Sequence, residues 1–300
     1  MSDSVRTALV TGSNGGVGLA LAQRLAADGW RVLLHGRDAA KLDRAFRSLP
    51  VAAGVQHLAL GADLADPDAV QRLARETAEA TDRLDALVHN AGLVRPALER
   101  TPAGVEVTHA VNALAPFELT NALRPLLEST AEAFGDARVV TVSSEAHRGG
   151  RFPASDARAI AATMRGPSDP SRYSSVRAYA QSKLVATTWT LELARRLEGT
   201  GVTANACHPG VVRTGVFDGV SGVLGVLARA ASVFYLSPER GAASPYLLAT
   251  DPAYATRTGR WVTQSHLRRP HEASPPDEAL SAAVGAAVWE ALASLAAASA

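Results

Sequence analysis

Short runs of apolar residues alternate with longer amphipathic stretches through the first two-thirds of the chain. The short runs have the length of buried strands, whereas the longer stretches repeat apolar residues at helical spacing. Such alternation is typical of strand–helix–strand units around a parallel sheet. Strands are predicted at residues 8–11, 31–35, 56–60, 84–89, 138–143 and 202–207, with helices at 17–28, 39–49, 67–80, about 101–129 and about 176–198.

Two internal segments interrupt this alternation. Residues 146–175 are rich in Arg, Gly, Pro and Ser, and form a connection whose length usually indicates function or mobility. Residues 215–236 are apolar and rich in Gly and Val, and Asp218 and Arg229 are their only charges. We therefore interpret the first segment as an insertion and the second as a surface that contacts an apolar ligand or another apolar surface.

The tail differs from the rest in composition. A turn-rich piece at 271–276 precedes a helical extension predicted at about 277–297. No internal repeat or compositional linker divides the chain, so a single domain over residues 1–300 is expected.

Composition narrows the possible functions. Of the 300 residues, 47% are hydrophobic and 20% are charged, as in an ordinary soluble globular protein. The net charge is +1 and the arginines are scattered, which argues against a nucleic-acid partner. The single cysteine, Cys207, excludes an internal disulfide and a multi-cysteine metal site, and fits a cytoplasmic location. The N-terminus lacks a secretion signal and no integral membrane segment is expected.

A glycine-rich turn follows the first predicted strand and leads at once into a helix. Glycines at such a turn let the backbone approach a pyrophosphate, which the amides and dipole of the helix N-terminus then stabilise. Similar turns also join strands to helices without any ligand, but this position directly after the first strand favours a nucleotide. The predicted residues of this loop are Gly12, Ser13, Asn14, Gly16, Val17 and Gly18. The fold class is therefore α/β, a Rossmann-type doubly wound parallel sheet with helices on both faces.

The end of the second strand distinguishes between nicotinamide cofactors. A carboxylate there would bind the adenosine ribose and repel a 2′-phosphate, but this chain has Gly36-Arg37. Arg37 suits a bidentate contact with the phosphate, so NADP(H) is favoured over NAD(H), unless Arg37 is only a surface residue. After the third strand, Asp63 and its neighbour Leu64 are expected at the adenine. Asp63 is alternatively a helix cap.

Tyr179 and Lys183 form a Tyr-x-x-x-Lys pair on a predicted helix, in a chain where only two of the 30 Lys and Arg residues are lysines. Positions i and i+4 share a helix face, so the ammonium is expected near the phenol. A cation there would lower the pKa of Tyr179 toward a range where the phenol exchanges a proton with a substrate. The alternative interpretation is a solvated helix face.

In its order of motifs, the chain resembles the short-chain dehydrogenase/reductase family over about residues 5–265. Its branch of retinol dehydrogenases and related carbonyl reductases is the most similar. The residues that carry the resemblance are Gly12, Gly16 and Gly18 of the first loop, Asp63, Asn90-Ala91-Gly92, Asn112, Ser143-Ser144, Tyr179, Lys183 and Pro209-Gly210.

The resemblance implies a role for each matched residue. Tyr179 is the expected general acid or base, Ser144 rather than Ser143 bonds the same substrate oxygen, and Lys183 lowers the Tyr179 pKa and bonds the nicotinamide ribose. Asn112 would hold a water that relays protons through Lys183, unless it only bonds locally in its helix. Further cofactor contacts are expected from Asn90, Ala91, Gly92, Pro209, Gly210, Val212 and Thr214. His89 and His208 are interpreted as strand-end residues, and no metal site is expected.

The chain departs from the family pattern at the insertion. Tyr179 follows Ser144 by 35 positions (179 minus 144), against roughly a dozen in the family. In relatives such insertions border the substrate cleft or cover the helix face that pairs subunits, so a monomer or dimer is expected rather than a tetramer. Residues of about 212–240 occupy the place of the substrate lid, with an interfacial membrane segment as the rival interpretation.

These observations predict an NADP(H)-dependent oxidoreductase that interconverts a carbonyl and an alcohol on a lipophilic small molecule. Two alternatives stay open. One is a reductase of a conjugated carbon–carbon double bond, which uses the same tyrosine and lysine. The other is a nucleotide-binding regulatory protein without turnover, although such a protein would have no need to keep the four catalytic residues.

Overall fold

The computed structural model describes residues 5–212 and 236–299. Its centre is one eight-stranded sheet in the order β3-β2-β1-β4-β5-β6-β7-β8, in which all neighbours are parallel except the antiparallel pair β7 and β8. The strands are β1 (Thr7–Val10), β2 (Arg31–Gly36), β3 (Leu58–Gly61), β4 (Ala86–His89), β5 (Ala137–Val142), β6 (Val202–Cys207), β7 (Trp261–Thr263) and β8 (His271–Ala273).

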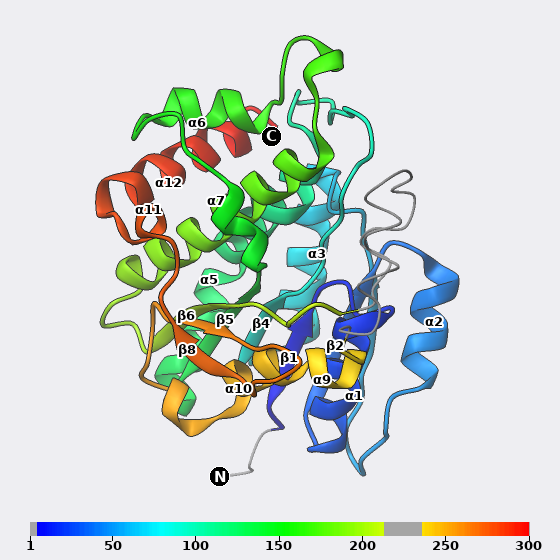
Figure 1. Cartoon of the computed structure of the whole chain (residues 1–300). Coiled ribbons are helices and arrows are strands. Elements are labelled where there is room, and N and C mark those ends of the chain that lie inside the picture. The colour runs from blue at the N-terminus through cyan, green and yellow to red at the C-terminus, as the bar shows by residue number, and fades with distance from the viewer. Residues whose placement is uncertain (1–4, 213–235, 300) are drawn as a thin grey trace.

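Helices cover both faces of the sheet (Figure 1). Within the described residues they are α1 (Gly16–Ala27), α2 (Ala39–Arg47), α3 (Pro67–Ala80), α4 (Val107–His109), α5 (Ala115–Phe134), α6 (Ala157–Met164), α7 (Ser175–Arg196), α9 (Pro238–Gly241), α10 (Ala243–Thr250), α11 (Asp277–Leu280) and α12 (Ala282–Ala297). The predicted doubly wound α/β fold is confirmed.

The strands divide their apolar side chains between two hydrophobic clusters. In β1, Leu9 packs in the cluster with α3, α5 and α7, while Ala8 and Val10 pack on the other face with α1, α2 and α10. The same alternation holds in β2, because successive side chains of a strand point to opposite faces. Both faces are therefore buried, as expected for a parallel sheet.

The strand order reverses direction between β1 and β4. In open α/β sheets the loops on either side of such a point separate and leave a crevice at the carboxyl ends of the strands, where ligands bind. The loops after β1 and β4 contain the glycine turn and Asn90. The topology therefore places two of the predicted cofactor motifs at this crevice.

The long helix predicted at 101–129 is wrong in its first part. Helical backbone begins at Val107, where the Glu106 carboxylate accepts hydrogen bonds from the amides of Thr108 and His109 and caps α4. A π-helical segment, Ala110–Leu114, then joins α4 to α5, which continues to Phe134. The sequence pattern shows apolar spacing but not a change in hydrogen-bond register, so this segment could not be seen in it.

Two other expectations need correction. The connection at 146–175 contains α6 and two 3-10 turns, Glu145–Gly149 and Pro170–Arg172. The turn-rich piece at 271–276 begins with strand β8, which pairs with β7. These elements have between three and eight residues, which is too short for local periodicity to reveal them.

The tail forms two helices rather than one, because the Ser281 side chain caps the start of α12 at the amide of Val284. α12 packs along α6 and α7, and the three helices lie together at the upper left of Figure 1. Residues 213–235, which include most of the predicted lid, lie outside the described residues. No helix in the described part of the chain is long and apolar enough to span a membrane.

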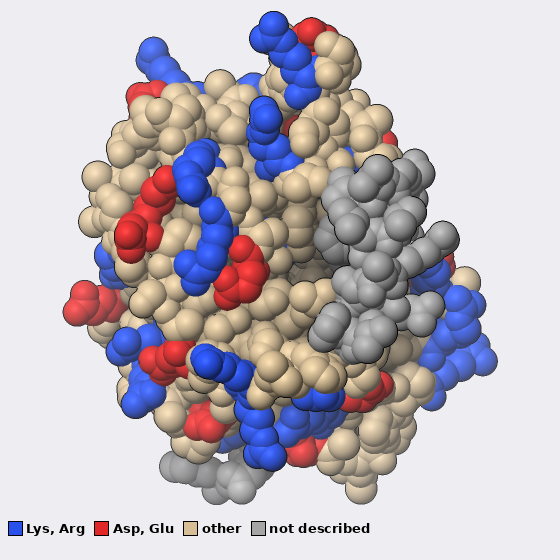
Figure 2. Space-filling model, in the orientation of Figure 1, with Lys and Arg blue, Asp and Glu red and all other residues tan. Residues whose placement is uncertain are grey.

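Acidic and basic side chains are interspersed over most of the face that Figure 2 shows, and a group of basic side chains lies at its right edge. Many of the arginines pair with nearby carboxylates, as Arg148 does with Glu145 and Arg257 with Glu272. This distribution agrees with the scattered arginines of the sequence, and these pairs leave little unbalanced positive charge.

Candidate active site

The predicted catalytic side chains come together at the carboxyl end of β5. Ser144 follows this strand and caps a 3-10 turn through the amide of Ala146. Tyr179 and Lys183 lie one helical turn apart on α7, which begins at Ser175 after the Ser174 side chain caps its first turn. A hydrogen bond joins the side chains of Ser144 and Tyr179. Two hydroxyls therefore face the same small region.

The adjacent Ser143 has a different environment. Its side chain is buried, with 3% exposed, and its hydroxyl donates to the carbonyl of Lys183 at 3.0 Å and accepts from Thr187 at 2.9 Å. These bonds tie the end of β5 to α7. Ser143 thus serves the packing between strand and helix, which leaves Ser144 as the serine beside the phenol.

The pKa of Tyr179 does not follow the sequence expectation. Burial raises it above its ordinary value, and the hydrogen bond with Ser144 offsets this only in part. The Lys183 ammonium lies 5.8 Å from the centroid of the tyrosine ring. The predicted lowering by Lys183 is therefore wrong for this structure, and the phenol holds its proton at neutral pH.

Lys183 is itself buried, with 5% of its surface exposed, and its ammonium donates to the carbonyl of Val142 at 2.9 Å. Burial lowers its pKa to about 8, because the charged ammonium loses hydration there. A neutral thiol is the expected neighbour, because burial raises the pKa of Cys207 well above its usual range. The lysine is thus close to losing its proton near physiological pH, which the sequence alone did not indicate.

Asn112 lies in the π-helical segment and uses its side chain as a tether. Its amide donates to the carbonyl of Leu93 and to the hydroxyl of Ser182, both at 3.0 Å, and its oxygen accepts from the Leu93 amide at 2.9 Å. Ser182 in turn donates to the carbonyl of Tyr179. None of these bonds lies within the helix of Asn112 itself, so they differ from the local role considered from the sequence and instead link the loop after β4 to the catalytic helix.

The main-chain carbonyl of Asn112 lacks its usual α-helical hydrogen-bond donor. In an α-helix this carbonyl would accept from the amide four residues later, but that residue is Pro116, which has no N–H. The π-helical turn occurs at the same place. Pro116 therefore removes the α-helical donor from the Asn112 carbonyl, a signal that was visible in the sequence and was missed.

The glycine loop is packed closely against the loop after β4. Gly12 adopts φ 65°, and a Cβ there would meet the Cα of Ala91 at 2.8 Å. The Asn90 side-chain amide donates to the carbonyls of Thr11 and Gly12. A side chain at Gly18 would collide with Asn90. These contacts bring the Asn90 motif and the glycine loop together.

The first turn of α1 has no side-chain cap. Gly15 occupies the N-cap position and makes no side-chain hydrogen bond, whereas Asp38, Asp66 and Ser174 cap α2, α3 and α7. The amides of this turn are thus available to a ligand. Free amides at a helix N-terminus are the usual partners of a phosphate.

Other residues predicted in this loop make structural contacts. Ser13 is fully buried, and its hydroxyl accepts from the amide of His35, which holds the loop against β2. Asn14 lies against Gly36. Val17 is buried and packs near Gly241 at the end of α9.

His35 is a residue that the sequence interpretation missed. Its Nδ1 accepts from the amide of Gly12 at 3.2 Å, and its Nε2 lies 3.1 Å from the carbonyl of Ala62 after β3. These partners require the neutral tautomer with the proton on Nε2. Burial lowers the pKa of His35 to about 4, so this bridge between the glycine loop and β3 persists at neutral pH.

Arg37 and Asp63 lie together at the ends of β2 and β3. Arg37 donates to Asp63 at 3.3 Å, and 58% of the Arg37 side chain is exposed, so the guanidinium can reach an incoming anion. Asp63 also accepts from the amide of Ala65, while Asp66 caps α3. Asp63 is therefore not the cap of that helix. Leu64 beside it is buried.

Gly92 brings the loop after β4 to the catalytic side chains. A Cβ at Gly92 would lie 3.3 Å from the Asn112 side-chain oxygen and 3.4 Å from the ammonium of Lys183. The absence of a side chain there leaves this space open between the cofactor motif and the lysine.

The loop after β6 is held by Gln264, which follows β7. Its side-chain amide donates to the carbonyl of Pro209 at 2.8 Å. Gly210 adopts φ 79°, and Val212 forms an isolated bridge with Leu236. Thr214 lies outside the described residues. Gln264 is a supporting residue that the sequence did not indicate, because its partners are distant in the chain.

The two histidines beside these motifs are buried. His89 bonds Thr120 at 2.7 Å and meets Trp189 edge-on, and burial lowers its pKa to about 3. His208 has a pKa lowered to about 4, mainly by burial. Both imidazoles are neutral at physiological pH and lie at strand ends, as expected.

Comparison with known proteins agrees with this geometry. Residues 6–155 match the family model for short chain dehydrogenases. Human retinol dehydrogenase 13 is 34% identical over 262 residues, which cover 85% of this chain and 75% of that protein. Bovine dehydrogenase/reductase SDR family member 13 is 36% identical over 277 residues, covering 91% and 70%.

Solved structures are similar as well. A crystal structure of an uncharacterized protein from Mycobacterium paratuberculosis superposes with a TM-score of 0.76 at 30% identity, covering 97% of this chain and 93% of that one. The Pseudomonas aeruginosa RhlG/NADP active-site complex gives a TM-score of 0.65 at 28% identity, with coverage of 87% and 95%. The chain belongs to the short-chain dehydrogenase family, on its retinol dehydrogenase branch, and is an NAD(P)-dependent oxidoreductase of alcohol and carbonyl groups.

Proposed function

We propose that this enzyme uses NADP(H) to interconvert a carbonyl and an alcohol on a lipophilic small molecule, with Tyr179 as the proton donor and acceptor. The observation that supports this most directly is the convergence of Ser144, Tyr179, Lys183 and Asn112 beside an uncapped glycine loop. Three of the similar proteins are named retinol dehydrogenases, and retinol is a lipophilic alcohol.

The residues present fit a dinucleotide. The open amides at the start of α1 suit its pyrophosphate, and the absence of a side chain at Gly15 and Gly92 leaves room for a ligand to approach the backbone closely. Asn90 fixes this wall, and Lys183 is positioned to bond the ribose next to the nicotinamide. When bound, the nicotinamide supplies or accepts the hydride.

Tyr179 and Ser144 handle the substrate oxygen. Because burial raises the pKa of Tyr179, the phenol is protonated at neutral pH and suits the reductive direction, in which it donates a proton to the carbonyl oxygen. Ser144 hydrogen-bonds the same oxygen and orients it. In the oxidative direction the phenol must first lose its proton, and burial opposes that step.

The main-chain carbonyl of Asn112 has a proposed role in returning the proton to Tyr179. Because Pro116 removes the α-helical donor to the Asn112 carbonyl, we propose that this carbonyl, rather than the tethered side chain, holds a water near Lys183. The water would return the proton to Tyr179 after each turnover.

Replacing Pro116 with alanine tests this role. The new N–H can close the α-helical bond to Asn112, so we expect kcat to fall about tenfold while the dissociation constant of NADPH is unchanged. Steady-state kinetics and cofactor titration measure the two effects. Pro125→Ala, inside the same helix but distant from Asn112 in sequence, is the matched control. An unchanged kcat in Pro116→Ala would remove the carbonyl from the mechanism.

The choice of cofactor is proposed to depend on Arg37. We expect Arg37→Ala to weaken NADPH binding by roughly 10- to 100-fold, because a charge-assisted hydrogen bond contributes about 1.5–3 kcal/mol. NADH lacks the 2′-phosphate, so its affinity should change little. Calorimetric titration of both cofactors measures the difference. Arg47→Ala, which removes another exposed arginine that pairs with Asp43, controls for net charge. Equal losses for both cofactors would contradict the proposal.

The reaction itself is tested by a substrate panel. NADPH and NADH consumption should be followed with aliphatic, aromatic, steroid-like and polyketide-like ketones and aldehydes, with identification of the products. Alcohol products support the proposed reaction. A saturated carbonyl compound from a conjugated substrate would instead identify a double-bond reductase, and no consumption with any substrate would favour a regulatory nucleotide-binding protein.

We also propose that the enzyme is a monomer or a dimer. α12 packs on α7, and α6 packs on α12, so that α12 covers part of the helical surface of this face (Figure 1). Light scattering of the purified protein at several concentrations gives the mass in solution, and a tetramer would overturn this expectation.

A further inference from the structure

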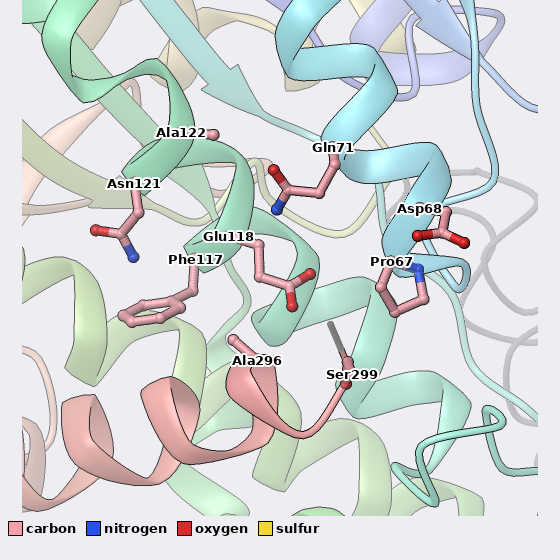
Figure 3. A pocket seen from close by; sticks show the side chains of 9 residues that line it. All are labelled: Pro67, Asp68, Gln71, Phe117, Glu118, Asn121, Ala122, Ala296 and Ser299. Atoms are coloured by element: carbon pink, nitrogen blue, oxygen red, sulfur yellow. The ribbon is translucent and has the colours of Figure 1, made fainter.

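A pocket of about 260 Å³ lies between α3, α5 and α12, away from the glycine loop and the catalytic tyrosine. Figure 3 shows side chains from all three helices around it. Glu118 of α5 points into the space between Pro67 of α3 and Ala296 of α12. The nucleotide and carbonyl chemistry proposed above uses none of these residues.

Glu118 is an unusual residue in this position. Only 8% of it is exposed, and its carboxyl group makes no hydrogen bond or ion pair within the described part of the chain. A buried carboxyl without a partner is costly, so such groups in proteins are normally paired. Burial raises the pKa of Glu118 to about 7. A ligand that donates hydrogen bonds and carries positive charge would satisfy this group.

The other residues that line the pocket indicate the charge and the polarity of that ligand. The one other titratable side chain among the described lining residues is Asp68, and the lining includes no lysine or arginine. The C-terminal end of α12 adds the negative end of its helix dipole. Phe117 and Pro67 supply apolar surface, and the Phe117 ring is held edge-on by Trp289 at 4.8 Å between ring centroids.

A metal ion fits these walls poorly. No group of three or more His, Cys, Asp or Glu side chains that could hold a metal is found among the residues described. Phe117 and Pro67 would also offer a hydrated metal ion no side-chain ligand and no hydrogen bond. An organic cation satisfies both the carboxyl and the apolar walls.

From these contacts we infer that this pocket binds a small organic ammonium ion, with its nitrogen on the Glu118 carboxylate and its apolar part on Phe117 and Pro67. The amides of Gln71 and Asn121 also line the pocket and are available to further polar groups of the ligand. This site is independent of the oxidoreductase function.

Benzylammonium, benzyl alcohol and benzoate, which share a ring and differ in charge, are suitable probes. Calorimetric or NMR titration of the full chain should give saturable binding of benzylammonium, with at least tenfold weaker binding of the alcohol and of benzoate. Affinity should increase from pH 6 to pH 8, because burial raises the pKa of Glu118 to about 7 and its carboxyl group ionises in that range. Equal affinity for the alcohol, or no saturation by benzylammonium at 10 mM (roughly the weakest affinity that still marks a site), would overturn the proposal.

Two variants locate the site. Glu118→Gln keeps the shape and removes the charge, and should weaken benzylammonium at least tenfold. Ala122→Trp, at an exposed lining position, should block the pocket while Glu118 stays in place. Glu128→Gln is the matched control, because this glutamate lies on the same helix but pairs with Arg124. Binding that survives both pocket variants would place the ammonium elsewhere and refute the inference, whatever the outcome of the NADPH assays.

Discussion

Replacing Tyr179 with phenylalanine should abolish turnover while NADPH binding stays nearly unchanged. The substitution removes one hydroxyl, the one that hydrogen-bonds Ser144, and keeps the ring that packs near Lys183. Loss of a positioned general acid typically lowers a rate by about 10²–10⁴-fold. Steady-state kinetics with the best substrate of the panel, together with NADPH titration, measures both quantities.

A matched control is available on another helix. Tyr246→Phe removes a phenol that bonds Asp28 and lies on α10, outside the catalytic residues. This variant should retain the kcat of the wild type. If Tyr179→Phe also retained full activity, the proton would have to come from another group and the proposed mechanism would fail.

Replacing Lys183 with methionine should reduce both catalysis and cofactor affinity. Methionine has a similar length without charge, so the variant loses the hydrogen bonds expected to the ribose and the electrostatic support of a tyrosinate. We expect kcat/KM to fall by roughly 10²-fold or more and NADPH to bind about tenfold more weakly. Lys41→Met is the control, since Lys41 is the other lysine of the chain and lies exposed on α2.

Lys183→Met should reduce activity but should not reduce the folding stability at pH 7. The pKa of Lys183 is lowered to about 8 in the folded protein, against 10.5 in the unfolded chain, so the unfolded state holds this proton more tightly. At pH 7 the buried ammonium therefore costs up to about 3 kcal/mol of folding free energy. Lys183→Met should be at least as stable as the wild type at pH 7.

The stability difference between wild type and Lys183→Met should also depend on pH. Between about pH 8 and 10 the wild-type lysine loses its proton in the folded state, and its stability should rise relative to the variant. Denaturant unfolding at pH 7 and pH 9.5 measures this change. A variant that is less stable by the same amount at both pH values would show that the lysine is not strained by burial.

Much of the fold followed from local patterns. All six predicted strands are present, and the bounds of α3 and β6 match the prediction. Asp66-Pro67 starts a helix by itself, and β6 alternates small apolar residues with Thr203 and Asn205. Strands β7 and β8 were missed. They have three residues each, which is too short to show a period, and β7 is placed by its pairing with β6, which is distant in the sequence.

Some residues of the site could likewise be predicted from the sequence, whereas the roles of others could not. The glycine loop and the Tyr-x-x-x-Lys pair were visible because each is a short motif whose chemistry depends on residue type and spacing. The roles of Ser143 and Pro116 were not assigned, since the first depends on contacts with α7 and the second on the hydrogen-bond register of a helix.

By itself the sequence determined the α/β fold, the family and the residues that meet at the site. Only the tertiary structure decided the electrostatics of that site. Tyr179 was expected to have a lowered pKa because Lys183 is four residues away, yet burial raises it and lowers that of Lys183. The physical reason is that desolvation depends on every segment that covers a side chain, including segments far away in the sequence, whereas a motif records only near neighbours.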